Sequence, residues 1–153
     1  MATAIIAVLG TLLGAVTAGA MQHLITLSAR RDRDRQALSA AVADLLGAAT
    51  DHRRHQYLKY AVRRPGEPAE TFDMRAARWE AKSTMDKAMT ALVLATDDPG
   101  LLRLAADLVA ASCEVGEPAY DDRPAIADAS DRTHQAHTAF ETAAARHLRR
   151  SLR

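Results

Sequence analysis

The chain has 153 residues, of which 48% are hydrophobic but only 4% aromatic, and its formal net charge is +1. This length allows one compact domain with a terminal segment and excludes a large multidomain enzyme. A β-sheet protein is disfavoured, because strands are rich in aromatic and β-branched residues, whereas this chain is rich in alanine and leucine. Cys113 is the single cysteine, which excludes an intramolecular disulfide and a thiolate zinc cluster. We expect its thiol to be a small buried apolar group.

Residues 1–29 contain no Asp, Glu, Lys or Arg and are predicted to form a transmembrane anchor. The stretch is long enough, because crossing the hydrocarbon core of a bilayer takes about 20 helical residues. No basic side chain precedes it, but Arg30, Arg31, Arg33 and Arg35 follow it directly. Because positive residues stay on the cytoplasmic side, we expect the N-terminus outside and residues 30–153 in the cytoplasm. These arginines are also expected to contact lipid headgroups.

Two alternatives to the anchor remain open. Ala18, Gly19 and Ala20 fit the small-residue rule for a cleaved signal peptide. The absence of a basic region before the apolar stretch and the arginines just after it both oppose export. The other alternative is a buried helix of a soluble protein. We expect a retained anchor.

Small residues within the anchor predict self-association in the membrane. Gly10 and Gly14 form a GxxxG pair that Ala18 extends by one further turn. Such rows allow two helix backbones to approach closely in lipid. An alanine-rich segment also produces these spacings by chance, so composition alone is the alternative explanation.

The remainder, residues 30–153, is predicted to be all-α and to form an antiparallel bundle of three to four helices. Proline and glycine at 65–68 and 116–118 break the chain, and Asp98 before Pro99 is a favourable helix start. Short connections make successive helices antiparallel neighbours. No proline interrupts the passage from the anchor into the first helix, which can therefore continue from it. The expected helices span 28–64, 71–95, 99–115 and 124–152.

Apolar residues at helical spacing predict the buried face of each helix. In the first helix this face contains Leu38, Val42, Leu45, Ala49 and His52. In the second it contains Phe72, Ala76, Trp79, Met85, Met89, Leu92 and Val93. In the third it contains Leu101, Leu104, Leu108 and Val109, and in the last Ile126, Thr133, Ala136, Phe140, Ala143 and either His147 or Leu148.

Two His-x-x-His motifs are the candidate for metal chemistry. His52 and His55 lie on the first helix, and His134 and His137 on the last, with Glu141 one turn further on. An i, i+3 spacing places each pair on one helical face, so two adjacent helices could offer four nitrogen ligands to zinc. A metal-binding enzyme or sensor is therefore an alternative function. The other interpretation is a set of polar surface positions, and we expect neither a metal nor a cofactor.

The C-terminus is basic, with Arg146, Arg149, Arg150 and Arg153 in the last eight residues. This tail could contact anionic lipid or the phosphates of a nucleic acid, or it could be a solvated helix end. A membrane-tethered nucleic-acid binder is therefore a second alternative function.

The apolar opening from Ile5 to Gly14, the arginine-rich exit and the polar stretch from Asp51 to Arg54 resemble the KilB-like proteins of actinobacterial conjugative elements. The shared layout covers most of the chain, although the signature lies largely in the first 55 residues. The resemblance implies a membrane-associated role in plasmid spread and brings no catalytic residues. We therefore expect a non-enzymatic, single-pass membrane protein that associates with itself or with a membrane protein partner.

Overall fold

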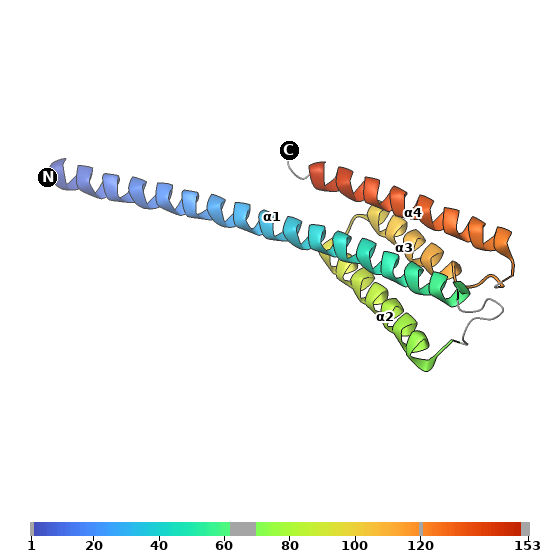
Figure 1. The fold of residues 1–153 in the computed structure, drawn as a ribbon. Coiled ribbons are helices and arrows are strands. Elements are labelled where there is room, and N and C mark those ends of the chain that lie inside the picture. Colours follow the sequence, from blue (N-terminus) through green and yellow to red (C-terminus); the bar gives the residue numbers. More distant parts are fainter. Residues whose placement is uncertain (1, 62–69, 120, 151–153) are drawn as a thin grey trace. The chain divides into compact units, whose positions relative to one another are not determined.

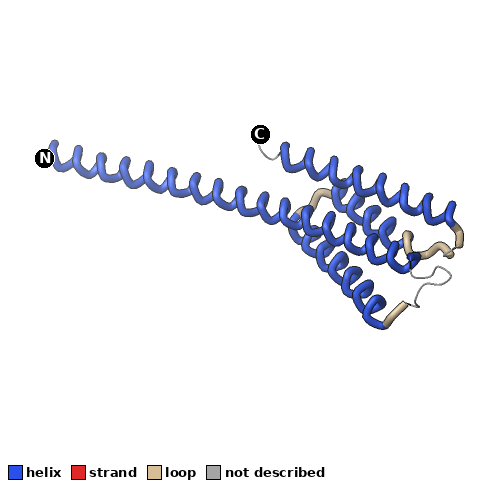
Figure 2. Tube along the Cα trace, viewed as in Figure 1, coloured by secondary structure: helices blue, strands red, loops and turns tan. Residues whose placement is uncertain are grey.

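The structure is a computed structural model that describes the backbone of residues 2–61, 70–119 and 121–150. Within these ranges the side chains are described from residue 21 onward, except for Leu24. The described residues form four helices and no strand (Figures 1 and 2). The predicted all-α class is therefore confirmed.

The first helix, α1, spans Ala2–Ala61 and runs from the predicted anchor into the predicted first bundle helix without a break. The chain divides into two units, one comprising Met1–Gln36 and the other Ala37–Arg153. Among the residues with described side chains, no helix has a stretch long and apolar enough to cross a membrane. The predicted anchor falls mainly on residues 1–20, which lie outside the described side chains, as do Gly10, Gly14 and Ala18.

The second unit contains the end of α1, followed by α2 (Phe72–Ala95), α3 (Pro99–Glu114) and α4 (Arg123–Arg150). Successive helices run in opposite directions, as expected for short connections (Figure 1). Helix α3 packs against both α2 and α4. The expected helices over 71–95, 99–115 and 124–152 correspond to α2, α3 and α4, although residues 151–153 lie outside the described part.

The core of this unit is built from small and medium apolar side chains of all four helices. The predicted face of α1 is confirmed, because Leu38, Val42, Leu45, Ala49 and His52 are all buried. Opposite this face the largest fully buried side chains are Met85, Leu92, Leu108 and Phe140. Many of the remaining core positions are alanines, so the helices pack closely through small residues.

Side-chain caps set where α2 and α3 begin. The Thr71 hydroxyl accepts a hydrogen bond from the Met74 backbone N–H at 3.3 Å. At α3, the Asp98 carboxylate accepts from the N–H groups of Gly100 (2.8 Å) and Leu101 (3.0 Å). These contacts satisfy backbone donors that have no partner within the helix. Asp98 also contacts His147 Nδ1 of α4 at 2.9 Å, so this cap connects two helices.

The predicted face of α2 is wrong in its first half. Phe72 is 79% exposed and Trp79 69% exposed, and Val93 further along is also exposed. The row that α2 buries is Ala81, Met85, Ala88 and Leu92. Phe72 and Trp79 lie roughly 120–140° around the helix from Met85, because each residue advances about 100°. The helix therefore carries two apolar rows, and its neighbours in the bundle cover only one.

Candidate functional site

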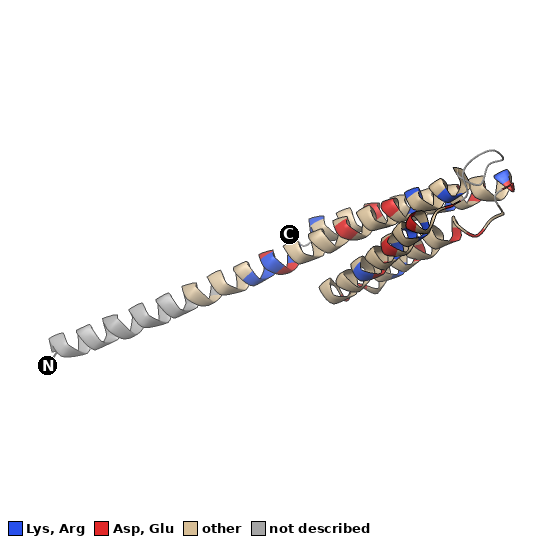
Figure 3. Cartoon of the chain, turned by 60° about the horizontal axis from the view of Figure 1, so that its bottom comes forward, with Lys and Arg blue, Asp and Glu red and all other residues tan. Residues whose placement is uncertain are grey.

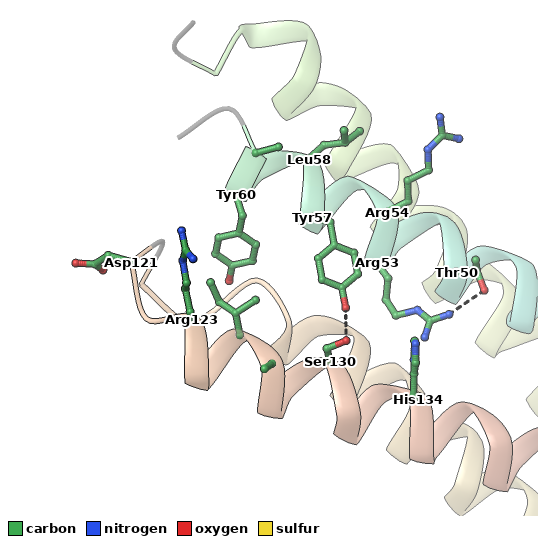
Figure 4. A pocket seen from close by; sticks show the side chains of 13 residues that line it. Thr50, Arg53, Arg54, Tyr57, Leu58, Tyr60, Asp121, Arg123, Ser130 and His134 are labelled. Carbon is green, nitrogen blue, oxygen red and sulfur yellow. Dashed lines mark hydrogen bonds between the residues drawn. The ribbon is translucent and has the colours of Figure 1, made fainter. Parts of the chain in front are cut away.

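A groove of about 1260 Å³ lies between the last turns of α1 and the first half of α4 (Figure 4). Both segments belong to the second unit. The groove combines cationic, aromatic and aliphatic side chains. It is lined by Thr50, Arg53, Arg54, Tyr57, Leu58, Tyr60 and Ala61 of α1, by Asp121, and by Arg123, Ile126, Ala127, Ser130 and His134 of α4.

Hydrogen bonds between segments far apart in sequence hold the groove together. Tyr57 donates its hydroxyl to Ser130 Oγ at 2.7 Å, which connects α1 to α4 (Figure 4). Tyr60 donates to the Val115 carbonyl at 2.6 Å, and Lys59 donates to the Gly116 carbonyl at 2.5 Å. The end of α1 is thereby fixed against both α4 and the connection between α3 and α4. The tyrosine hydroxyl groups are used within the protein, and their rings form a wall of the groove.

The groove is electropositive. Arg53, Arg54 and Arg123 contribute three guanidinium groups, and Asp121 is the one carboxylate among the described lining residues. None of these arginines forms an ion pair with a carboxylate in the described part of the chain. Figure 4 shows Arg53 and His134 at one end of the groove, Arg123 at the other, and the two tyrosines between them. Such an arrangement can bind an anionic ligand that also has apolar or planar groups.

A family model for the KilB plasmid transfer protein matches residues 38–148. A curated relative, Protein KilB of Streptomyces lividans, is 36% identical over 151 residues. That alignment covers 95% of this chain and 97% of the relative. The chain belongs to the KilB family. No solved structure matches it at a significant level.

Membership of the KilB family confirms the resemblance inferred from the sequence. The signature was expected largely in the first 55 residues, whereas the family model matches residues 38–148 and the alignment with the relative covers nearly the whole chain. All the groove residues fall within the matched range 38–148. The groove therefore lies within the part of the chain that the family model matches.

The four histidines of the two His-x-x-His motifs do not come together as a metal site. Among the described side chains, no three His, Cys, Asp or Glu residues are close enough to hold a metal ion. His52 is only 2% exposed, and the charges that act on it include Lys82 and Asp86 of α2. His134 is exposed in the groove instead. The interpretation of all four as polar surface positions is also wrong for His52, which belongs to the core.

Burial perturbs two of these histidines. The pKa of His52 is lowered, mainly because burial disfavours the charged imidazolium, and the Lys82 charge lowers it further. Asp86 opposes this shift, whereas His55 and Arg78 add to it. The pKa of His137 is lowered chiefly by burial as well, with a further contribution from Arg53 of α1, whereas Glu141 acts in the opposite direction.

These shifts predict that the bundle is less stable in mild acid. The unfolded chain takes up protons as the pH falls below about 6.5, whereas buried His52 and His137 resist protonation, so stability is lost in that range. We expect a lower Tm at pH about 5 than at pH about 7.5, measured by circular dichroism. His52→Leu should narrow this difference, whereas His134→Gln at an exposed position should not. If His52→Leu shows the same difference in Tm between the two pH values as the unmodified chain, His52 is not a source of the acid sensitivity.

The other predicted site residues are placed only in part. Arg30, Arg31 and Arg33 are exposed and Arg35 is half-buried, all within the first unit. Figure 3 shows basic and acidic residues intermixed along the helices, including this segment of α1. In the basic tail, Arg146, Arg149 and Arg150 are exposed near the end of α4, whereas Arg153 lies outside the described residues. Their roles at lipid headgroups or phosphates stay predictions.

The thiol of Cys113 is half-buried and packs against the core. Burial raises the pKa of this thiol, which keeps it protonated and weakly nucleophilic. The predicted packing role agrees with this position.

Sequence reasoning missed the main residues of the groove, namely Tyr57, Tyr60 and Arg123. One signal was available in the sequence DHRRHQYLKY at 51–60, where two tyrosines follow a run of basic residues on one helix. Tyr57 and Tyr60 are three residues apart and therefore share one face. Arg123 gave no such signal, because only the fold brings the start of α4 to this face.

Proposed function

We propose that this KilB family member is a non-enzymatic, single-pass membrane protein that serves plasmid transfer between cells by binding a partner. The observation that carries the proposal is the family match, which spans residues 38–148 and includes the whole groove. The relative that covers nearly the full chain is named for the same family.

The sequence supports the membrane anchor in this proposal. Residues 1–29 lack acidic and basic side chains over a length that is sufficient to span a bilayer. The arginines at 30–35 favour a cytoplasmic bundle and an external N-terminus. The Gly10, Gly14 and Ala18 row favours self-association of the anchor in lipid.

The composition of the groove supports binding as the activity of the bundle. Arginine and tyrosine are enriched at binding interfaces, where a few such side chains supply most of the affinity. Tyr57, Tyr60 and three arginines line the groove together. The metal-dependent alternative has no comparable support, because its histidines lie in different surroundings.

A mating assay tests the proposal. A donor strain that lacks this chain is expected to transfer its plasmid to fewer recipients than the intact donor. The full chain should restore transfer, whereas residues 30–153 alone should not, because they lack the anchor. Normal transfer by the deletion strain would refute the role in transfer, and full rescue by residues 30–153 would refute the need for an anchor.

A further inference from the structure

We propose that the groove between α1 and α4 binds single-stranded nucleic acid, with phosphates on its arginines and a base against the ring of Tyr57. This inference rests on the proposed binding role of the groove and names its ligand. It places nucleic-acid binding in the bundle and not in the basic tail at residues 146–153.

The charges of the groove suit a phosphate backbone. Arg53 and Arg123 lie at opposite ends of the row formed by the tyrosines (Figure 4), and Arg54 adds a third guanidinium to the lining. Within the described residues none of the three forms an ion pair with a carboxylate. Arg53 donates one hydrogen bond to the Thr50 hydroxyl at 3.3 Å, which leaves its charge unbalanced (Figure 4). Guanidinium groups bind phosphate oxygens in a two-point geometry.

The aromatic residues suit a base more than a peptide. The hydroxyl groups of Tyr57 and Tyr60 already donate hydrogen bonds to Ser130 and to the Val115 carbonyl. They therefore hold both rings in place, so that a ligand would meet a ring and not a hydroxyl group. The Lys59 ammonium already lies over the Tyr60 ring, 5.6 Å from its centroid, so Tyr57 is the ring on which a base would stack. Tyr57 is 37% exposed, which leaves part of its ring accessible. Flat aromatic surfaces bind unstacked bases with little dependence on sequence.

The size of the groove suits a polymer, and its rings favour a single strand. Its volume of about 1260 Å³ exceeds the ~300–1000 Å³ of typical small-molecule pockets. In a duplex the base faces are already stacked and cannot reach the rings, whereas a single strand exposes them. A positively charged groove that also offers an aromatic ring is typical of proteins that bind single strands without sequence preference.

Binding of a fluorescein-labelled oligo(dT) of about 15 nucleotides to the full chain in neutral detergent tests the inference by fluorescence anisotropy. Replacing Arg53 and Arg123 with glutamine should weaken binding. The slope of log K against the logarithm of the salt concentration should also become less steep, by ~0.7 for each phosphate that is no longer neutralised. The matched control is Arg75→Gln with Arg103→Gln, which removes the same charge from exposed positions on α2 and α3. We expect this control to bind nearly as tightly as the unmodified chain.

Variants of Tyr57 test the stacking. Tyr57→Phe keeps the ring and should retain binding, whereas Tyr57→Leu should weaken it about 5- to 100-fold. Circular dichroism establishes that each variant is folded before binding is compared. Equal binding by the phenylalanine and leucine variants would refute stacking on this ring.

Three further outcomes would overturn the inference. They are a failure of the full chain to bind oligo(dT), equally tight binding of an oligoglutamate of the same charge, and loss of binding only when Arg149 and Arg150 are replaced. The second would assign the groove to an acidic protein segment and the third would assign binding to the tail.

The proposed function is tested separately in the mating assay. If the Arg53 and Arg123 variant loses transfer while the chain binds no oligo(dT), the role in transfer stands and the ligand is wrong.

Discussion

Replacing Phe140 with alanine is expected to lower the free energy of unfolding by about 3–5 kcal/mol. Its side chain is fully buried at 0% exposure and packs within the core that all four helices share. The substitution removes apolar contacts and leaves a cavity that the surrounding helices can fill only in part. Urea unfolding of the full chain in mild detergent, followed by circular dichroism, measures the loss.

Phe72→Ala is the matched control, because it makes the same chemical change on an exposed helix position. Phe72 is 79% exposed at the start of α2, so its removal should change the free energy of unfolding by less than about 0.5 kcal/mol. If Phe140→Ala and Phe72→Ala lower the free energy of unfolding equally, the arrangement of the helices around the core is contradicted.

Alkaline phosphatase fused after Arg153 is expected to be inactive, whereas β-galactosidase fused at the same point is expected to be active. Phosphatase needs the disulfides that form outside the cytoplasm, and the proposed topology keeps the C-terminus inside. Replacing Arg30, Arg31, Arg33 and Arg35 together with glutamine should raise phosphatase activity. The reason is that basic residues next to a transmembrane segment set its orientation.

The matched control for this experiment neutralises the same number of charges in the tail, at Arg146, Arg149, Arg150 and Arg153. These residues lie far beyond the ~15–20 positions over which basic residues influence a transmembrane segment, so orientation should not change. Phosphatase activity in the fusion with all arginines intact would refute the cytoplasmic placement of the bundle.

The sequence by itself determined the all-α class and most of the helix boundaries. Proline, glycine and capping residues act through neighbours a few positions away, as Asp98 does at the start of α3. The buried face of α1 from Leu38 to His52 could also be predicted. This part of the helix has a single apolar row at helical spacing, so only that row can face the core. The family resemblance also followed from the amino-acid sequence alone, because it depends on the order of residues along the chain.

Only the tertiary structure decided between patterns that local spacing leaves equivalent. Helix α2 carries two apolar rows, and the positions of its neighbours bury the row of Met85 and expose that of Phe72 and Trp79. In the same way, packing buries His52 and leaves His134 exposed, although their motifs are alike. The groove depends on the contact between Tyr57 and Ser130, which lie 73 residues apart. Helical periodicity is a local property, whereas the choice of the covered face and of the residues that meet is made by the whole bundle.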